Sequence, residues 1–125
     1  MSLARVLVVD DDRSCAEIVA QLLRNNGCSV DVAWDGQAAL ELVTQNSYAL
    51  IVLDYQMPGM DGVEVYRRAV ELRPGLPALL VTAYPRIDVV YPAIDARFER
   101  VLAKPVNSQE LVPLVEQLIA QGDTA

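Results

Sequence analysis

Short apolar runs alternate along the chain with segments of helical periodicity. Four runs are almost wholly apolar, which is typical of central parallel strands covered by helices on both faces. They are Arg5–Val9, Ala49–Leu53, Ala78–Val81 and Val101–Ala103. The run Ser29–Ala33 instead alternates polar and apolar residues, which predicts a half-exposed strand at a sheet edge. The pattern therefore predicts five strands.

Helical spacing follows four of the five predicted strands and weakens in the segment beyond Thr82. After the first, apolar residues recur at i, i+3, i+4, i+7 and i+8, and we expect this stripe to face the core: Cys15, Ile18, Val19, Leu22 and Leu23. Further helices are expected over about 36–45 and 63–72, and from about Asn107 onward. Strand and helix thus alternate throughout, which predicts βαβ units and a parallel α/β sheet.

Two prolines fall inside expected helices. Pro92 lies in the segment between the fourth and fifth strands, and an interior proline costs about 3 kcal/mol or more. We therefore expect that helix to be short, kinked or partly 3₁₀. Pro113 lies in the last helix and is expected to bend it or to free a carbonyl.

Polar side chains stand where the core strands stop. Asp10, Asp11 and Asp12 follow the first strand, and three later strands end at Asp54, Thr82 and Lys104. In a parallel sheet these residues share one edge, where ligands of open α/β sheets bind. Two like charges about 4 Å apart at an effective dielectric of about 20 repel by about 4 kcal/mol. A hard divalent cation held by oxygen ligands removes that cost. The alternative for the acidic run is a solvated turn in which Asp12 caps the next helix.

Length and composition limit the class of protein. The chain has 125 residues, 53% of them hydrophobic, which predicts one domain over 1–125 with a core at about 4–121 and a linker stub at 122–125. The net charge of −7 argues against direct nucleic-acid binding. Lack of histidine excludes histidine catalysis and histidine-ligated zinc. No apolar run is long enough to span a membrane and no signal peptide precedes the first strand, so a cytoplasmic location with reduced cysteines is expected.

Together, these motifs resemble the receiver domain of two-component response regulators, the CheY-like family. The resemblance covers essentially the whole chain and rests on the order and spacing of five short motifs: Asp10-Asp11, Asp54–Pro58, Asp61-Gly62, Thr82-Ala83 and Lys104-Pro105. It implies a doubly wound, five-stranded parallel sheet in the order 2-1-3-4-5, with helices on both faces.

The resemblance also implies the roles of the site residues. Asp54 would accept a phosphoryl group from a phosphohistidine, Lys104 would pair with Asp54 at rest and with the phosphoryl group afterwards, and Thr82 would donate its hydroxyl to that group. The Lys104–Pro105 peptide bond is expected to be cis. Such a domain is a signalling phosphoacceptor that catalyses only its own phosphorylation and dephosphorylation.

A magnesium site is implied by the same motifs. Asp11 would bind the ion directly, Asp10 would act through water, and Asp54 and the backbone carbonyl of Gln56 would complete the protein ligands. Mg²⁺ suits an incomplete oxygen cage because it keeps several waters.

Expected partners follow from the resemblance too. They are a sensor histidine kinase or histidine phosphotransfer protein, and an output domain or second copy that contacts the face of the fourth helix, the last strand and the last helix. No direct nucleic-acid or membrane contact is expected. Val101 stands where receivers commonly carry an aromatic ring that swings inward, so we expect switching to rely on loop and helix rearrangement.

Three alternative interpretations of the sequence assign it to other classes of protein. A phosphatase of the haloacid dehalogenase type would use Asp10, Asp12, Thr82 and Lys104, but it needs a later acidic pair. After Lys104 the chain offers only Glu110, Glu116 and Asp123. A pseudo-receiver would be an interaction module that is never phosphorylated, although this chain keeps every acidic element. A nucleotide- or flavin-binding domain would need a Gly-rich loop after the first strand, which is absent.

Overall fold

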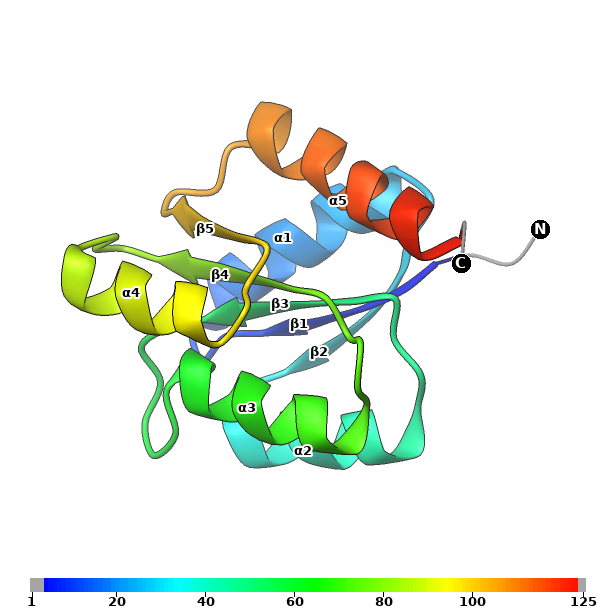
Figure 1. Ribbon diagram of the computed structural model, residues 1–125. Coiled ribbons are helices and arrows are strands. Elements are labelled where there is room, and N and C mark those ends of the chain that lie inside the picture. The colour runs from blue at the N-terminus through cyan, green and yellow to red at the C-terminus, as the bar shows by residue number, and fades with distance from the viewer. Residues whose placement is uncertain (1–3, 124–125) are drawn as a thin grey trace.

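Five parallel strands form one sheet in the order β2-β1-β3-β4-β5, which confirms the expected fold class (Figure 1). The structure is a computed structural model that describes residues 4–123. The strands are β1 (Arg5–Val9), β2 (Ser29–Ala33), β3 (Leu50–Asp54), β4 (Ala78–Thr82) and β5 (Arg100–Ala103). The alternating run 29–33 is at an edge of the sheet, as predicted, and β5 forms the other edge.

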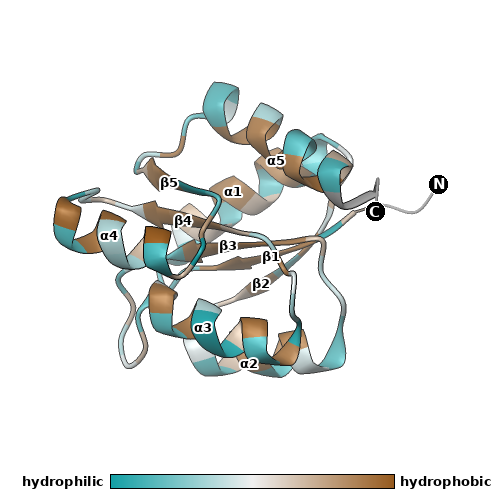
Figure 2. Ribbon diagram, in the orientation of Figure 1, coloured by the Kyte–Doolittle hydropathy of each residue, from teal (hydrophilic) through white to brown (hydrophobic). Residues whose placement is uncertain are grey.

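Helices cover both faces of this sheet (Figure 1). They are α1 (Arg13–Asn25), α2 (Gly36–Gln45), α3 (Gly62–Leu72), α4 (Ile87–Asp95) and α5 (Ser108–Asp123). One face packs against α1 and α5 and the other against α2, α3 and α4. The central strands β1, β3 and β4, which contribute to both cores, are mostly brown in Figure 2. Within residues 4–123 no helix has the length and apolar character needed to cross a lipid bilayer.

Alternation along the strands builds the two cores. Successive side chains of a strand point to opposite faces. Leu7 and Val9 therefore join the core under α2 and α3, whereas Val6 and Val8 join the core under α1 and α5. Runs that are apolar at every position fill both cores at once, which explains why the central strands show no polar alternation.

The buried face of α1 differs from the predicted stripe. The residues that face the sheet are Ala16, Val19, Ala20 and Leu23, and Ile18 is 58% exposed. The two alanines are small enough to let the helix backbone approach the sheet closely. The helix is therefore rotated toward them, and Ile18 is placed at the edge of the contact.

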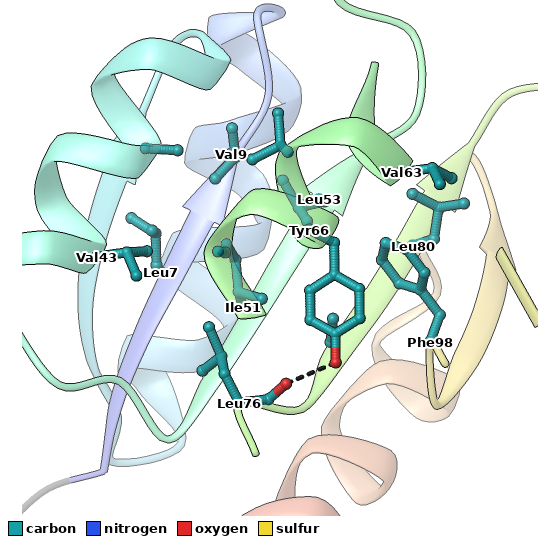
Figure 3. Packing of buried hydrophobic residues seen from close by; sticks show 14 of the residues in the cluster. Leu7, Val9, Val43, Ile51, Leu53, Val63, Tyr66, Leu76, Leu80 and Phe98 are labelled. Carbon is teal, nitrogen blue, oxygen red and sulfur yellow. Dashed lines mark hydrogen bonds between the residues drawn. The ribbon is translucent and has the colours of Figure 1, made fainter. Parts of the chain in front are cut away.

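A tyrosine and a phenylalanine close the core under α3 and α4 (Figure 3). The Tyr66 hydroxyl donates a 2.7 Å hydrogen bond to the Leu76 carbonyl, so its buried polar atom is satisfied. Its ring lies 4.6 Å, centroid to centroid, from that of Phe98, which follows α4. Phe98 thereby fixes the chain between α4 and β5 to the core.

The prediction for α4 is right in part. The helix is short, at nine residues, and it is α-helical throughout, including at Pro92, so the expected 3₁₀ segment is wrong. Pro92 removes the donor for the carbonyl of Asp88, and that residue is exposed, where water can bond the carbonyl. Helix α5 likewise continues through the exposed Pro113.

Helix α5 runs farther than the sequence suggested. It extends to Asp123, so the first two residues of the expected stub 122–125 are helical. Residues 124–125 lie outside the described part of the chain.

Helix α4 ends in a left-handed residue that is not glycine. Arg97 has φ 74°, and the amides of Arg97 and Phe98 donate to the carbonyls of Ile94 and Ala93. This is a Schellman arrangement, in which glycine is the usual residue at the left-handed position. An L-residue there costs roughly 1–2 kcal/mol of backbone strain.

We expect Arg97→Gly to raise the free energy of unfolding by about 0.5–1 kcal/mol. The strain relieved is partly offset by the greater freedom of glycine in the unfolded chain. Urea unfolding followed by circular dichroism measures the change, with Arg100→Gly, in a strand, as the destabilising control. A loss of stability in Arg97→Gly would contradict this account.

Candidate functional site

The carboxyl edge of the sheet gathers the polar residues that end the strands. Asp10 directly follows β1, Asp54 and Thr82 are the last residues of β3 and β4, and Lys104 directly follows β5. The register aligns these ends, since Asp54 is paired with Val81 and Thr82 with Ala103. The strand pattern therefore brings residues 94 positions apart, Asp10 and Lys104, into one site, as predicted.

Lys104 is shared between two buried carboxylates. Its Nζ lies 3.0 Å from Oδ2 of Asp10 and 3.2 Å from Oδ1 of Asp54. Asp10 and Asp54 are only 5% and 6% exposed. Sequence reasoning paired Lys104 with Asp54 alone, so the bond to Asp10 is an addition from the structure. One ammonium facing two carboxylates leaves the group with an excess negative charge.

That excess charge shifts the acid–base properties of the site. Burial, and then the charge of Asp10, raise the pKa of Asp54 to about 7, although Lys104 acts in the opposite direction. Burial lowers the pKa of Lys104, but the hydrogen bond to Asp10 and the charges of both carboxylates outweigh burial, and its pKa is raised overall. Lys104 is therefore a fixed cation at neutral pH, whereas Asp54 needs further positive charge to ionise fully.

The three consecutive aspartates divide into two roles. Asp12 is the N-cap of α1, because its Oδ1 accepts hydrogen bonds from the amides of Ser14 and Cys15 at 3.0 and 3.2 Å. These bonds hold the pKa of Asp12 below its usual range. Asp10 faces the site and its Oδ1 accepts from the Asp12 amide at 2.9 Å. The alternative of a capping turn is thus correct for Asp12, while Asp10 belongs to the buried cluster.

The carboxylates of Asp10, Asp11 and Asp54 form a group that could hold a metal ion. Each offers an oxygen, and these oxygens lie within 4.8 Å of one another. Asp11 is exposed and borders the same surface hollow as Gln56, whose carbonyl the sequence motif had singled out. The donors are oxygens only, and the open side of the group leaves room for water, so the residues fit Mg²⁺.

Thr82 is buried on the other side of Asp54. Its Oγ1 accepts a hydrogen bond from the amide of Tyr84 at 3.1 Å, which fixes the start of the β4–α4 loop. The Lys104–Pro105 bond is cis, as the resemblance implied.

The loop after Asp54 is held by a close backbone contact that sequence reasoning did not identify. The Gly62 amide donates to the Tyr55 carbonyl at 2.9 Å, and Asp61 caps α3 through the Glu64 amide. A Cβ at Gly62 would overlap the backbone carbonyl oxygen of Asp54. Only glycine therefore permits α3 to begin directly against Asp54. The Asp61-Gly62 motif was visible in the sequence, but its steric reason was not.

The raised pKa of Asp54 predicts an unusual pH dependence of stability. The folded state holds the Asp54 proton to about pH 7, whereas an unfolded chain releases it near pH 4. The folded state thus binds more protons across this window, and the free energy of unfolding should fall as pH rises from about 4 to 7. The expected loss is of the order of 4 kcal/mol over the whole window, of which about 3 kcal/mol falls between pH 5 and pH 8.

Urea unfolding in a metal chelator at pH 5 and pH 8 checks this dependence. Magnesium should stabilise the protein more at pH 8, since it binds the ionised carboxylate. Asp54→Asn serves as the control, because it removes the titrating group and should flatten the profile. Greater stability at pH 8 than at pH 5 in the metal-free protein would contradict the prediction.

Comparison with known sequences points to one family. The profile described as the response regulator receiver domain matches residues 6–116. The response regulator MprA of Mycobacterium sp. (strain KMS) is 38% identical over 115 residues, covering 92% of this chain and 50% of the relative. MprA of Mycobacterium leprae (strain TN) is 37% identical over the same shares. The chain spans about half the length of these curated relatives.

Solved structures show the same likeness. A CheY-like response regulator receiver domain protein from Methanospirillum hungatei JF-1 has a TM-score of 0.93 at 28% identity, with 98% of each chain covered. A response regulator from Chloroflexus aurantiacus J-10-fl has a TM-score of 0.87 at 34% identity, covering 95% of this chain and 99% of the other.

Proposed function

The chain belongs to the family of response regulator receiver domains, and we propose that it is a magnesium-dependent phosphoacceptor of a two-component system or phosphorelay. The observation that supports this most directly is the position of Asp54. Its carboxylate lies at the carboxyl edge of the sheet, 3.2 Å from the Lys104 ammonium and beside Asp10 and Asp11. The phosphatase, pseudo-receiver and nucleotide-binding alternatives are not favoured by the family match.

Phosphoryl transfer to Asp54 forms one bond to phosphorus and breaks another. A carboxylate oxygen of Asp54 forms a bond to phosphorus while the bond from phosphorus to the donor histidine nitrogen breaks. The electron pair stays on that nitrogen, which takes up a proton. Attack needs the ionised carboxylate, and burial beside Asp10 opposes ionisation. Positive charge must therefore assemble around Asp54 for the reaction to proceed.

Lys104 and the acidic group would supply that charge. The Lys104 ammonium is within reach of Asp54 and would pair with a phosphoryl oxygen in the product. Thr82, at the end of the neighbouring strand, would donate its hydroxyl to the same group. A magnesium ion held by Asp10, Asp11, Asp54 and the Gln56 carbonyl would neutralise phosphoryl oxygens.

Phosphorylation by a small donor tests the proposal. After treatment with acetyl phosphate and Mg²⁺, intact mass spectrometry should show the addition of one phosphoryl group per chain. The same treatment with the metal chelated should leave the mass unchanged. Equal uptake with and without the metal would refute magnesium dependence, and no uptake under either condition would refute the phosphoacceptor role.

We expect Asp11→Ala to weaken magnesium binding by at least tenfold. The substitution removes an exposed charged ligand without emptying a buried site, so the fold should persist. Trp34 directly follows Ala33, the last residue of β2, whose carbonyl accepts a hydrogen bond from the Asp10 amide. The fluorescence of Trp34 should therefore report a magnesium titration. Asp35→Ala, which removes an aspartate that caps α2 and does not belong to the acidic group, is the matched control. Wild-type affinity in Asp11→Ala would mean that Asp11 is not a ligand.

The proposed phosphodonor is a sensor histidine kinase or a histidine phosphotransfer protein in the cytoplasm. For the output, we propose the face of α4, β5 and α5 as the contact with an output domain or a second copy. Helix α4 carries exposed Ile87, Tyr91 and Ile94 at i, i+4 and i+7, which line one side of the helix.

A further inference from the structure

An apolar cavity of about 240 Å³ adjoins the acidic site on the α1 and α5 face of the sheet. Its floor is formed by Val8, Val52 and Val81, the last apolar residues on this face of three neighbouring strands. One wall comes from α1 and the other from the loop after β5. The cavity is distinct from the surface hollow bordered by Asp11 and Gln56, which lies on the proposed metal side.

The packing of α1 explains why space remains here. Two of the α1 residues that face the sheet are the small Ala16 and Ala20, and Ile18 lines the cavity but stays 58% exposed instead of filling it. Cys15 and Val106 reach the cavity from half-buried positions on its two walls. Covering apolar surface that is still in contact with water contributes about 25 cal/mol to the binding free energy for each Å².

We propose that this cavity binds a small, uncharged, mostly apolar molecule of about the size of one aromatic ring. The volume is sufficient, because an engineered apolar cavity of about 150 Å³ in another protein binds benzene. Asp10, Asp54 and Lys104 stand at one end of the cavity but are paired with one another. Most of the lining is apolar, so a charged ligand would lose its hydration among valines and the lining favours an uncharged one.

Titration of the isotope-labelled chain with toluene, followed by amide NMR shifts, tests the site without any phosphodonor. We expect saturable one-to-one binding with a dissociation constant of the order of 1 mM, and shifts centred on the β1, β3 and α1 residues that line the cavity. Shifts that do not saturate, or that centre on the exposed apolar residues of α4, would overturn the proposal.

Two variants that fill the cavity sharpen the test. Val106→Phe and Cys15→Met each extend a half-buried side chain into it from opposite walls, and each should weaken toluene binding at least tenfold. Thermal unfolding shows that each variant is folded, and one folded variant is sufficient. Ile94→Phe adds the same ring on exposed α4 and should bind as wild type does. Unchanged binding in the folded filling variants would place toluene elsewhere and refute the site.

A consequence for phosphoryl transfer rests on the proposed function. The Lys104 side chain lines the cavity, and its ammonium would shift from its position between Asp10 and Asp54 to meet a phosphoryl oxygen. A bound molecule packs against that side chain and opposes the movement, so saturating toluene should slow uptake from acetyl phosphate about fivefold. Val106→Phe should show no such slowing. No uptake in either condition refutes the phosphoacceptor role, whereas equal rates with and without toluene refute only this coupling.

Discussion

Asp54→Asn is expected to abolish phosphoryl uptake from acetyl phosphate completely. The amide keeps the size of the carboxylate and can still accept a hydrogen bond from Lys104, so the site should keep its shape. It lacks the anionic oxygen that must attack phosphorus. Intact mass after treatment with acetyl phosphate and Mg²⁺ should be that of the untreated variant.

Asp12→Asn is the matched control for this loss. Asp12 is two residues from Asp10 but is the N-cap of α1, and asparagine caps helices about as well as aspartate. Uptake should therefore continue at a rate close to that of the wild type. The reverse result, with Asp54→Asn labelled normally and Asp10→Asn unlabelled, would favour a phosphatase-like nucleophile on β1 and contradict the proposed role of Asp54.

The sequence predicted which polar residues gather at the carboxyl edge, because each of them ends or follows an apolar run. A parallel sheet brings the carboxyl ends of β3, β4 and β5 to one edge. The sequence alone therefore places Asp54, Thr82 and Lys104 near one another, without knowledge of how their side chains pack. The fold class followed from the same pattern. The strand order came from the family resemblance. Apolar runs of similar composition do not indicate which strands lie next to one another in the sheet.

Three features of the structure depend on packing and could not be read from the sequence pattern. The stripe of α1 was assigned to its larger residues, but Ala16 and Ala20 face the sheet because small side chains permit the closest approach. Helix α4 continues through Pro92, and the one hydrogen bond lost there falls at the exposed residue Asp88. The bond between Lys104 and Asp10 depends on how far the ammonium lies from the ends of β1 and β3. That distance cannot be read from the sequence.

Gly62→Ala is expected to be among the most destabilising single-methyl additions in this chain, by about 3 kcal/mol. The added Cβ would overlap the Asp54 carbonyl oxygen and would lie 2.9 Å from Cδ1 of Leu80, which is fully buried. A backbone carbonyl within a central strand cannot move without disturbing its ladder, so the start of α3 must shift instead. That shift would also break the bond from the Gly62 amide to Tyr55 and displace the loop around Gln56.

Gly59→Ala separates this steric effect from a general cost of losing glycine. Gly59 has φ 85°, which an alanine adopts only with strain, but its Cβ would meet nothing within 4 Å. Its cost should stay near 1 kcal/mol, the strain of a left-handed alanine. Gly62→Ala should therefore lose more stability in urea, although its backbone lies outside the left-handed region. It should also slow phosphoryl uptake, because the displaced loop carries the Gln56 carbonyl. If Gly59→Ala proved the more damaging of the two, backbone conformation and not the contact with Asp54 would explain why glycine is needed in this loop.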